Sequence, residues 1–158
     1  MVESVYIESS VISYLTARPS RDVVITARQA ITSGWWHNHR TEFELFISAL
    51  VVQEISKGDA QAAQQRLDAI EGLPLLQTSD EALSVAENLL AQGAVPANSE
   101  EDALHIGLAA SAGIDYLLTW NFKHINNAQT KKKIVSVVET YGFTCPILCS
   151  PEELGEEI

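Results

Sequence analysis

The sequence predicts an α/β fold in which a central, mostly parallel sheet is covered by helices on both faces. Short runs rich in β-branched and other apolar residues alternate with longer stretches of helical composition, which is typical of parallel strands joined by crossover helices. The chain has 158 residues, 46% of them hydrophobic, so it has the size of one ordinary domain with its own core. We therefore expect a single three-layer domain over residues 1–158.

Five short segments have the composition of strands. Each is dominated by β-branched, aromatic or leucine side chains and is bounded by polar residues or glycine, as strands usually are. The segment that ends at Thr119 is the most apolar in the second half of the chain. The expected strands are residues 5–7, 43–47, 73–77, 115–119 and 146–148.

Capping and breaking residues indicate where the helices begin and end. Ser48 precedes a helix-forming stretch and Gly58 follows it, as an N-cap and a C-terminal glycine do. The segment after Gly34, which contains two tryptophans, is expected to be an exposed connection, with the tryptophans filling the core or contacting a partner. The expected helices run from Ser9 or Ser10 to Arg18, over 22–33, 49–56 and 59–70, from Thr78 or Ser79 to Leu90, from Asn98 or Ser99 to Ala112, and over 126–141, with a further helix start at 150–153.

The charge of the chain excludes one class of function. Its formal net charge of -11 at pH 7 argues against a protein that coats nucleic acid through a broad basic face. Local cations remain: Arg18 and Arg21 follow the first acidic segment, and Lys123 follows the last. These three are candidates to contact a phosphate backbone, whereas the lysine run 131–133 is more typical of a solvated helix face.

Hydropathy and the N-terminal residues bear on where the protein is located. No apolar run approaches the roughly 18 residues of a membrane-spanning helix, and the N-terminus lacks the pattern of a secretory signal peptide. We therefore expect a cytoplasmic protein with no membrane partner.

Cys145 and Cys149 lie in one short strand-like segment, which suits neither a disulfide nor a four-ligand zinc site, so we expect both to be reduced packing residues.

Four segments place a carboxylate or an amide near the junction of a strand and a helix. Ligands of open α/β sheets bind outside the carboxyl ends of the strands, and Glu8 and Asn121 each follow a predicted strand. Glu54 lies on the helix after the second strand, and Asp102 begins a later helix. Carboxylate and amide oxygens suit Mg²⁺ or Mn²⁺. The sequence therefore predicts a metal site, provided that tertiary packing brings Asp102 to the same edge.

Each of these carboxylates also has a purely structural interpretation. Asp102 lies in the first turn of a helix, where the helix dipole stabilises a negative charge. Glu54 is placed to pair with Lys57 on its own helix. His105 lies one turn beyond Asp102, and we expect it to pack between helices rather than to approach the metal. Clustered carboxylates repel one another, so a shared site makes sense mainly with a cation present.

Four motifs follow one another in the chain: Tyr6-Ile7-Glu8-Ser9-Ser10-Val11-Ile12, residues 47–55, Glu101-Asp102-Ala103-Leu104-His105-Ile106 and residues 118–124. Their order, over nearly the whole chain, resembles the PIN domain, and within it the VapC-like toxins of bacterial toxin–antitoxin pairs. The resemblance implies a PIN-like three-layer fold and a metal-dependent endoribonuclease that hydrolyses RNA phosphodiester bonds. It also implies a homodimer that is held inactive by a cognate antitoxin protein.

The resemblance assigns roles to particular residues. The metal ligands would be Glu8, Glu54 and Asp102, with Mg²⁺ or Mn²⁺ as the cofactor. The Asn121 amide and the Thr119 hydroxyl would orient a water or the phosphate. The residues expected to contact the RNA are Arg18, Arg21 and Lys123.

Two positions depart from the usual pattern of the family. The first acidic position, usually Asp, is Glu8, which moves the carboxylate outward by one methylene. The fourth position, often Asp, is Asn121, which has no charge. An alternative function is therefore a catalytically weakened PIN-like binding module that acts through association with an antitoxin or with itself. A small phosphatase is disfavoured because no Asp-x-Asp motif follows the first strand.

Overall fold

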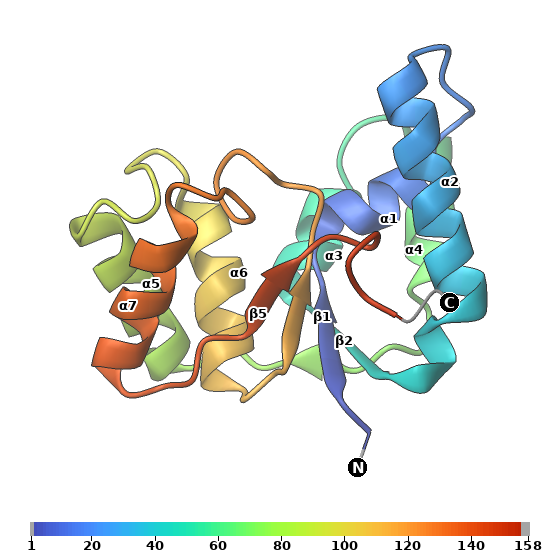
Figure 1. The fold of residues 1–158 in the computed structure, drawn as a ribbon. Helices are drawn as coiled ribbons and strands as arrows, with labels where there is room; N and C mark the ends of the chain where they lie inside the picture. The colour runs from blue at the N-terminus through green and yellow to red at the C-terminus, as the bar shows by residue number, and fades with distance from the viewer. Residues whose placement is uncertain (1, 156–158) are drawn as a thin grey trace.

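A computed structural model describes residues 2–155 of the chain and confirms the α/β class. Within these residues a five-stranded, all-parallel sheet has the strand order β3-β2-β1-β4-β5. The helices gather in two groups, with α5, α6 and α7 on one side of the molecule and α1 to α4 on the other (Figure 1). The strands are β1 (Ser4–Ile7), β2 (Glu44–Ser48), β3 (Leu75–Leu76), β4 (Tyr116–Leu118) and β5 (Ile147–Cys149).

The central strand carries the most buried residues, as its composition predicts. Val5, Tyr6 and Ile7 are fully buried, because β1 pairs with β2 on one side and with β4 on the other. The helices that cover the sheet are α1 (Ser9–Thr16), α2 (Val23–Asn38), α3 (Ala49–Ile55), α4 (Ala60–Ala69), α5 (Asp80–Ala91), α6 (Glu100–Ser111) and α7 (Lys131–Tyr141).

Several helix ends are formed by the predicted residues. Ser48 caps α3 by accepting a hydrogen bond from the Val51 N–H at 3.3 Å, and Ser79 caps α5 in the same way. Gly107 permits the close packing of α6 on α5, because a Cβ at this position would lie 2.3 Å from the carbonyl oxygen of Ala82. A side chain at this position would push α6 away from α5.

The predicted exposed connection after Gly34 is wrong. Helix α2 continues through this glycine to Asn38, and Trp35 and Trp36 are both buried. Trp35 stacks on Phe43 with a centroid separation of 6.0 Å. Burial of the two large aromatic side chains outweighs the small helix-breaking tendency of one glycine. The expectation that the tryptophans fill the core is confirmed.

Two further helix predictions differ from the structure near the carboxyl end. Helix α7 begins at Lys131 instead of residue 126, because side chains in the preceding loop compete for the backbone. Asn121 accepts a hydrogen bond from the His124 N–H, and Asn127 donates one to the Phe122 carbonyl. The predicted helix start at residues 150–153 is a turn in the structure. The loop 121–130 therefore lies free of α7, beside the carboxyl end of β4.

The cysteines behave as expected from their positions. Both thiols are free, and burial raises the pKa of each to about 12, so they stay protonated.

Across residues 2–155, no helix combines the length and the apolar character needed to cross a membrane.

Candidate metal-binding site

The strand order brings the predicted site segments to one edge of the sheet. It reverses between β1 and β4, so the carboxyl ends of these two strands lie side by side. Glu8 directly follows β1, and Thr119 directly follows β4. Such a switch point is where open α/β sheets bind ligands.

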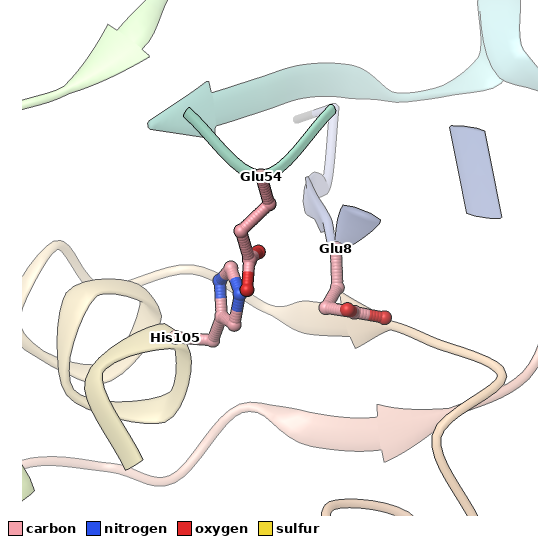
Figure 2. A group of neighbouring side chains, drawn as sticks. All are labelled: Glu8, Glu54 and His105. Carbon is pink, nitrogen blue, oxygen red and sulfur yellow. The ribbon is translucent and has the colours of Figure 1, made fainter. Parts of the chain in front are cut away.

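Three side chains from three different elements meet at this edge. Glu8 follows β1, Glu54 lies on α3 and His105 lies on α6, and their ligand atoms are all within 4.8 Å of one another. Figure 2 shows the Glu54 carboxylate against the His105 ring, with Glu8 beside them. Two carboxylates and an imidazole form a group that can bind a divalent metal.

The Glu54 carboxylate and the His105 imidazole form a close pair. Nε2 of His105 lies 2.7 Å from Oε1 of Glu54, which also accepts a hydrogen bond from the Ser9 hydroxyl at 2.5 Å. Burial alone would raise the pKa of Glu54, but the hydrogen bonds from His105 and Ser9 and the charge of His105 lower it. Burial alone would lower the pKa of His105, but Glu54 and the neighbouring carboxylates raise it. The lowered pKa of Glu54 and the raised pKa of His105 both favour the form of the pair in which both side chains are charged.

A buried tyrosine hydroxyl bonds the His105 ring from its other side. The Tyr6 hydroxyl lies 2.7 Å from Nδ1 of His105 and 2.7 Å from the Ser48 hydroxyl. Burial raises the pKa of Tyr6, so its hydroxyl stays protonated. Tyr6, itself bonded to Ser48, thus orients the imidazole in the way that supporting residues orient metal-ligating histidines.

Glu8 is positioned by hydroxyl groups from two segments. Its Oε1 accepts hydrogen bonds from the Thr119 hydroxyl at 2.7 Å and from the Ser10 hydroxyl. Thr119 also accepts a hydrogen bond from the Asn121 N–H at 2.9 Å. Within residues 2–155, no hydrogen bond reaches Oε2 of Glu8, which leaves this oxygen available to a cation.

Asp102 lies outside the group of three and pairs with residues of the 121–130 loop. Its Oδ2 is 2.7 Å from Nδ1 of His124, and its Oδ1 accepts a hydrogen bond from the Asn121 side-chain amide at 3.1 Å. Asn121 in turn reaches Thr119, so a chain of hydrogen bonds links Asp102 to Glu8. Asp102 is therefore connected to the group, but His105 takes the place beside Glu54.

The outcome for the predicted site residues is mixed. Glu8 and Glu54 lie together, whereas the ligand role of Asp102 stays a prediction. His105 is buried, as expected of a packing residue, yet its ring also belongs to the candidate metal group. Glu54 pairs with this ring and, among residues 2–155, forms no ion pair within 4.0 Å with Lys57.

The residues predicted to contact RNA lie on the surface. Arg18, Arg21 and Lys123 are exposed, and none of them takes part in the ion pairs formed by residues 2–155. Sequence reasoning missed the supporting residues Tyr6 and Ser9. A tyrosine on a central buried strand is a usable signal, because a buried phenolic hydroxyl needs a hydrogen-bond partner.

Comparisons with models of known protein families and with curated proteins give no match to this chain. The chemistry of the site therefore rests on its own geometry. The donor set of two carboxylates and one imidazole fits Mn²⁺ well and Mg²⁺ less well, since Mg²⁺ prefers oxygen ligands alone.

Proposed function

We propose that this protein is a metal-dependent endoribonuclease with a PIN-like fold, similar to the VapC-like toxins. The observation that carries the proposal is the meeting of Glu8, Glu54 and His105 at the β1/β4 switch point. Asp102 and Asn121 lie next to this group and are linked to it by hydrogen bonds. A carboxylate-rich group at this edge of a sheet suits hydrolysis of a phosphodiester, which needs no protein nucleophile when a metal is bound.

The residues of the site have distinct roles in this proposal. Glu8, Glu54 and His105 would hold Mn²⁺ or Mg²⁺. When bound, the metal supplies an activated water and neutralises charge on the phosphate. Thr119 keeps the Glu8 carboxylate in place, and Tyr6 keeps the His105 ring in place.

The proposed function also implies a location, an oligomeric state and partners for the protein. It places the protein in the cytoplasm as a homodimer, with RNA as its substrate and a cognate antitoxin as its inhibitor. Sedimentation of the purified protein tests the dimer, and a protein that stays monomeric at micromolar concentration would contradict that part.

Cleavage of a mixed pool of cellular RNA tests the activity. The purified protein is incubated with the RNA in Mg²⁺, Mn²⁺ or EDTA, beside Glu54→Gln and Asp102→Ala variants. We expect discrete cuts with a metal, none in EDTA, and loss of the cuts in Glu54→Gln. Gln61→Glu, which changes an exposed residue of α4, is the control and should cleave as the wild type does. Identical RNA in every lane would count against an endoribonuclease.

A second candidate function is a PIN-like binding module with weakened catalysis. The observation in its favour is that Asp102 is fully engaged by the protein, with one oxygen bonded to Asn121 and the other to His124. Glu8→Asp and Asn121→Asp restore the residues usual at these two positions in PIN domains. Cleavage that rises in these variants would indicate an attenuated nuclease, whereas no cleavage by any variant would favour the binding module.

A further inference from the structure

An arginine that sequence analysis did not single out lies against the two aromatic residues that flank Asn121. Arg28, on α2, places its guanidinium over two aromatic rings, 5.5 Å from the centroid of Trp120 and 5.1 Å from that of Phe122. These two aromatic residues flank Asn121 in the sequence. The two rings pack edge to face with a centroid separation of 5.9 Å. Arg28 is therefore fixed against the loop that carries Asn121.

Hydrogen bonds connect Trp120, the residue under Arg28, to the candidate metal-binding group of Glu8, Glu54 and His105. The Trp120 indole N–H donates to the Thr32 hydroxyl, one turn beyond Arg28 on α2, at 2.7 Å. The Trp120 backbone N–H donates to the Ser10 hydroxyl at 2.8 Å, and Ser10 donates to Glu8. The aromatic platform under Arg28 and the Glu8 carboxylate are thus held by the same hydroxyl group.

The guanidinium has most of its hydrogen-bonding capacity left. A guanidinium carries five N–H donors, and in the part of the chain that the structure describes only one contact uses them, to the Tyr14 hydroxyl at 3.4 Å. None of the ion pairs within 4.0 Å among these residues includes Arg28. In a chain with a net charge of -11, an arginine that forms no ion pair with a carboxylate of residues 2–155 is available to an external anion.

We propose that Arg28 binds a backbone phosphate of single-stranded RNA next to the metal group, with Trp120 and Phe122 as the platform that orients it. This inference rests on the proposed function for the identity of the anion. Guanidinium groups match phosphate oxygens in a bidentate geometry, and stacked arginines contribute to the binding of single-stranded nucleic acids. A cation at this place also offsets the repulsion between the polyanion and the carboxylates.

The chain offers a matched control in Arg40. Its guanidinium also lies over a tryptophan ring, 4.2 Å from the centroid of Trp36. Arg40 precedes β2 and so lies toward the amino ends of the strands, away from the metal group. A loss of stacking or of overall charge affects both arginines, whereas a loss of phosphate binding affects Arg28 alone.

The test is the binding of a fluorescent single-stranded RNA of mixed sequence, followed by anisotropy in EDTA over a series of KCl concentrations. We expect Arg28→Met to weaken binding about tenfold, as loss of a charge-assisted contact does. We also expect it to reduce the slope of log affinity against log salt by about 0.7, the value for one phosphate contact on a single strand. Arg28→Lys should keep the slope, and Arg40→Met should keep both affinity and slope.

Three results would overturn the inference. The first is an Arg28→Met protein that binds RNA with wild-type affinity and salt dependence, or whose affinity and salt dependence change as much as those of Arg40→Met. The second is a wild-type protein that does not bind RNA, which would also remove the RNA substrate from the proposed function. The third is competition by polyglutamate as strong as that by RNA of equal charge, which would indicate a site for an acidic protein. Binding that depends on Arg28 without metal-dependent cleavage would refute the nuclease alone.

Discussion

Two histidine–carboxylate pairs with the same separation lie in very different surroundings. The inner pair, Glu54–His105, and the outer pair, Asp102–His124, both have a nitrogen–oxygen distance of 2.7 Å. The His105 side chain is fully buried, whereas the His124 side chain is 21% exposed. The buried Tyr6 hydroxyl bonds the inner ring, whereas the outer ring lies in the 121–130 loop. Equal distances therefore do not make the pairs equivalent.

The difference in burial suggests that the two pairs have different roles in the site. The inner pair is held by regular elements, since Glu54 lies on α3, His105 lies on α6, and Tyr6 on β1 bonds the ring of His105 and is itself bonded to Ser48. The outer pair depends on a loop that side chains of asparagine hold in place. We expect the inner pair to determine metal binding and the outer pair to contribute less to it.

The largest expected effect is on stability, when the inner pair is broken. His105→Ala removes the partner of the Glu54 carboxylate and leaves a cavity, so we expect a loss of about 3 kcal/mol in the free energy of unfolding. His124→Ala breaks the outer pair and should cost less than about 1 kcal/mol. Urea unfolding in EDTA measures both values. Equal losses would mean that burial does not distinguish the two pairs.

The next effect is on metal affinity. Glu54→Gln keeps the shape of the side chain but removes its charge, and we expect the affinity for Mn²⁺ to fall by at least about 100-fold. This exceeds the roughly 10–100-fold loss that is typical for a residue that only supports a ligand. Asp102→Asn, the matched change in the outer pair, should lower the affinity by about tenfold. Calorimetric titration with MnCl₂ measures both, and a larger loss in Asp102→Asn would transfer the ligand role to Asp102.

These two pairs also show how far the sequence predicts the site. Glu8 and Glu54 are found by a local rule, since Glu8 directly follows β1 and Glu54 lies one to two helical turns beyond the carboxyl end of β2. The choice between Asp102 and His105 beside Glu54 is not local, because the two lie one turn apart on α6. It depends on how α6 packs on its neighbours, and the close contact of Gly107 with α5 is one part of that packing.

The fold shows the same limit at a larger scale. All five strands lie in the predicted regions, because a short apolar run between turn residues is a strong signal. The extension of α2 past Gly34 was missed, because the burial of Trp35 and Trp36 depends on tertiary packing. The position of Arg28 was missed as well, since its contact with Trp120 joins residues far apart in the sequence.

A smaller effect is expected in the pH dependence of stability without metal. The pKa of His105 is raised above its ordinary 6.5, so its contribution is fully present below pH 6.5 and is lost as the pH rises through the raised value. The pKa of Glu54 is lowered below its ordinary 4.5, so its contribution is present above pH 4.5 and is lost as the pH falls through the lowered value. The inner pair therefore contributes most between these two pH values.

Thermal unfolding in EDTA across this pH range measures the effect. We expect His105→Gln to flatten the loss of stability on the alkaline side, because the glutamine does not titrate. A profile for His105→Gln that runs parallel to the wild type would show that the inner pair is not charged in the folded protein.

The smallest effect tests whether the two pairs form one site. Asn121→Asp replaces the amide that donates to Asp102 with a second carboxylate, and we expect a loss of about 1 kcal/mol in EDTA from the lost hydrogen bond and the repulsion. Asn127→Asp is the control, because its amide donates to the Phe122 carbonyl instead of a carboxylate. A metal that binds near Asp102 stabilises the folded state by mass action and should offset the loss in Asn121→Asp but not in Asn127→Asp. Recovery of the melting temperature with Mn²⁺ in Asn121→Asp alone would place the outer pair within reach of the cation. The absence of recovery would leave the inner pair as a separate metal group, with Asp102 serving to hold the loop.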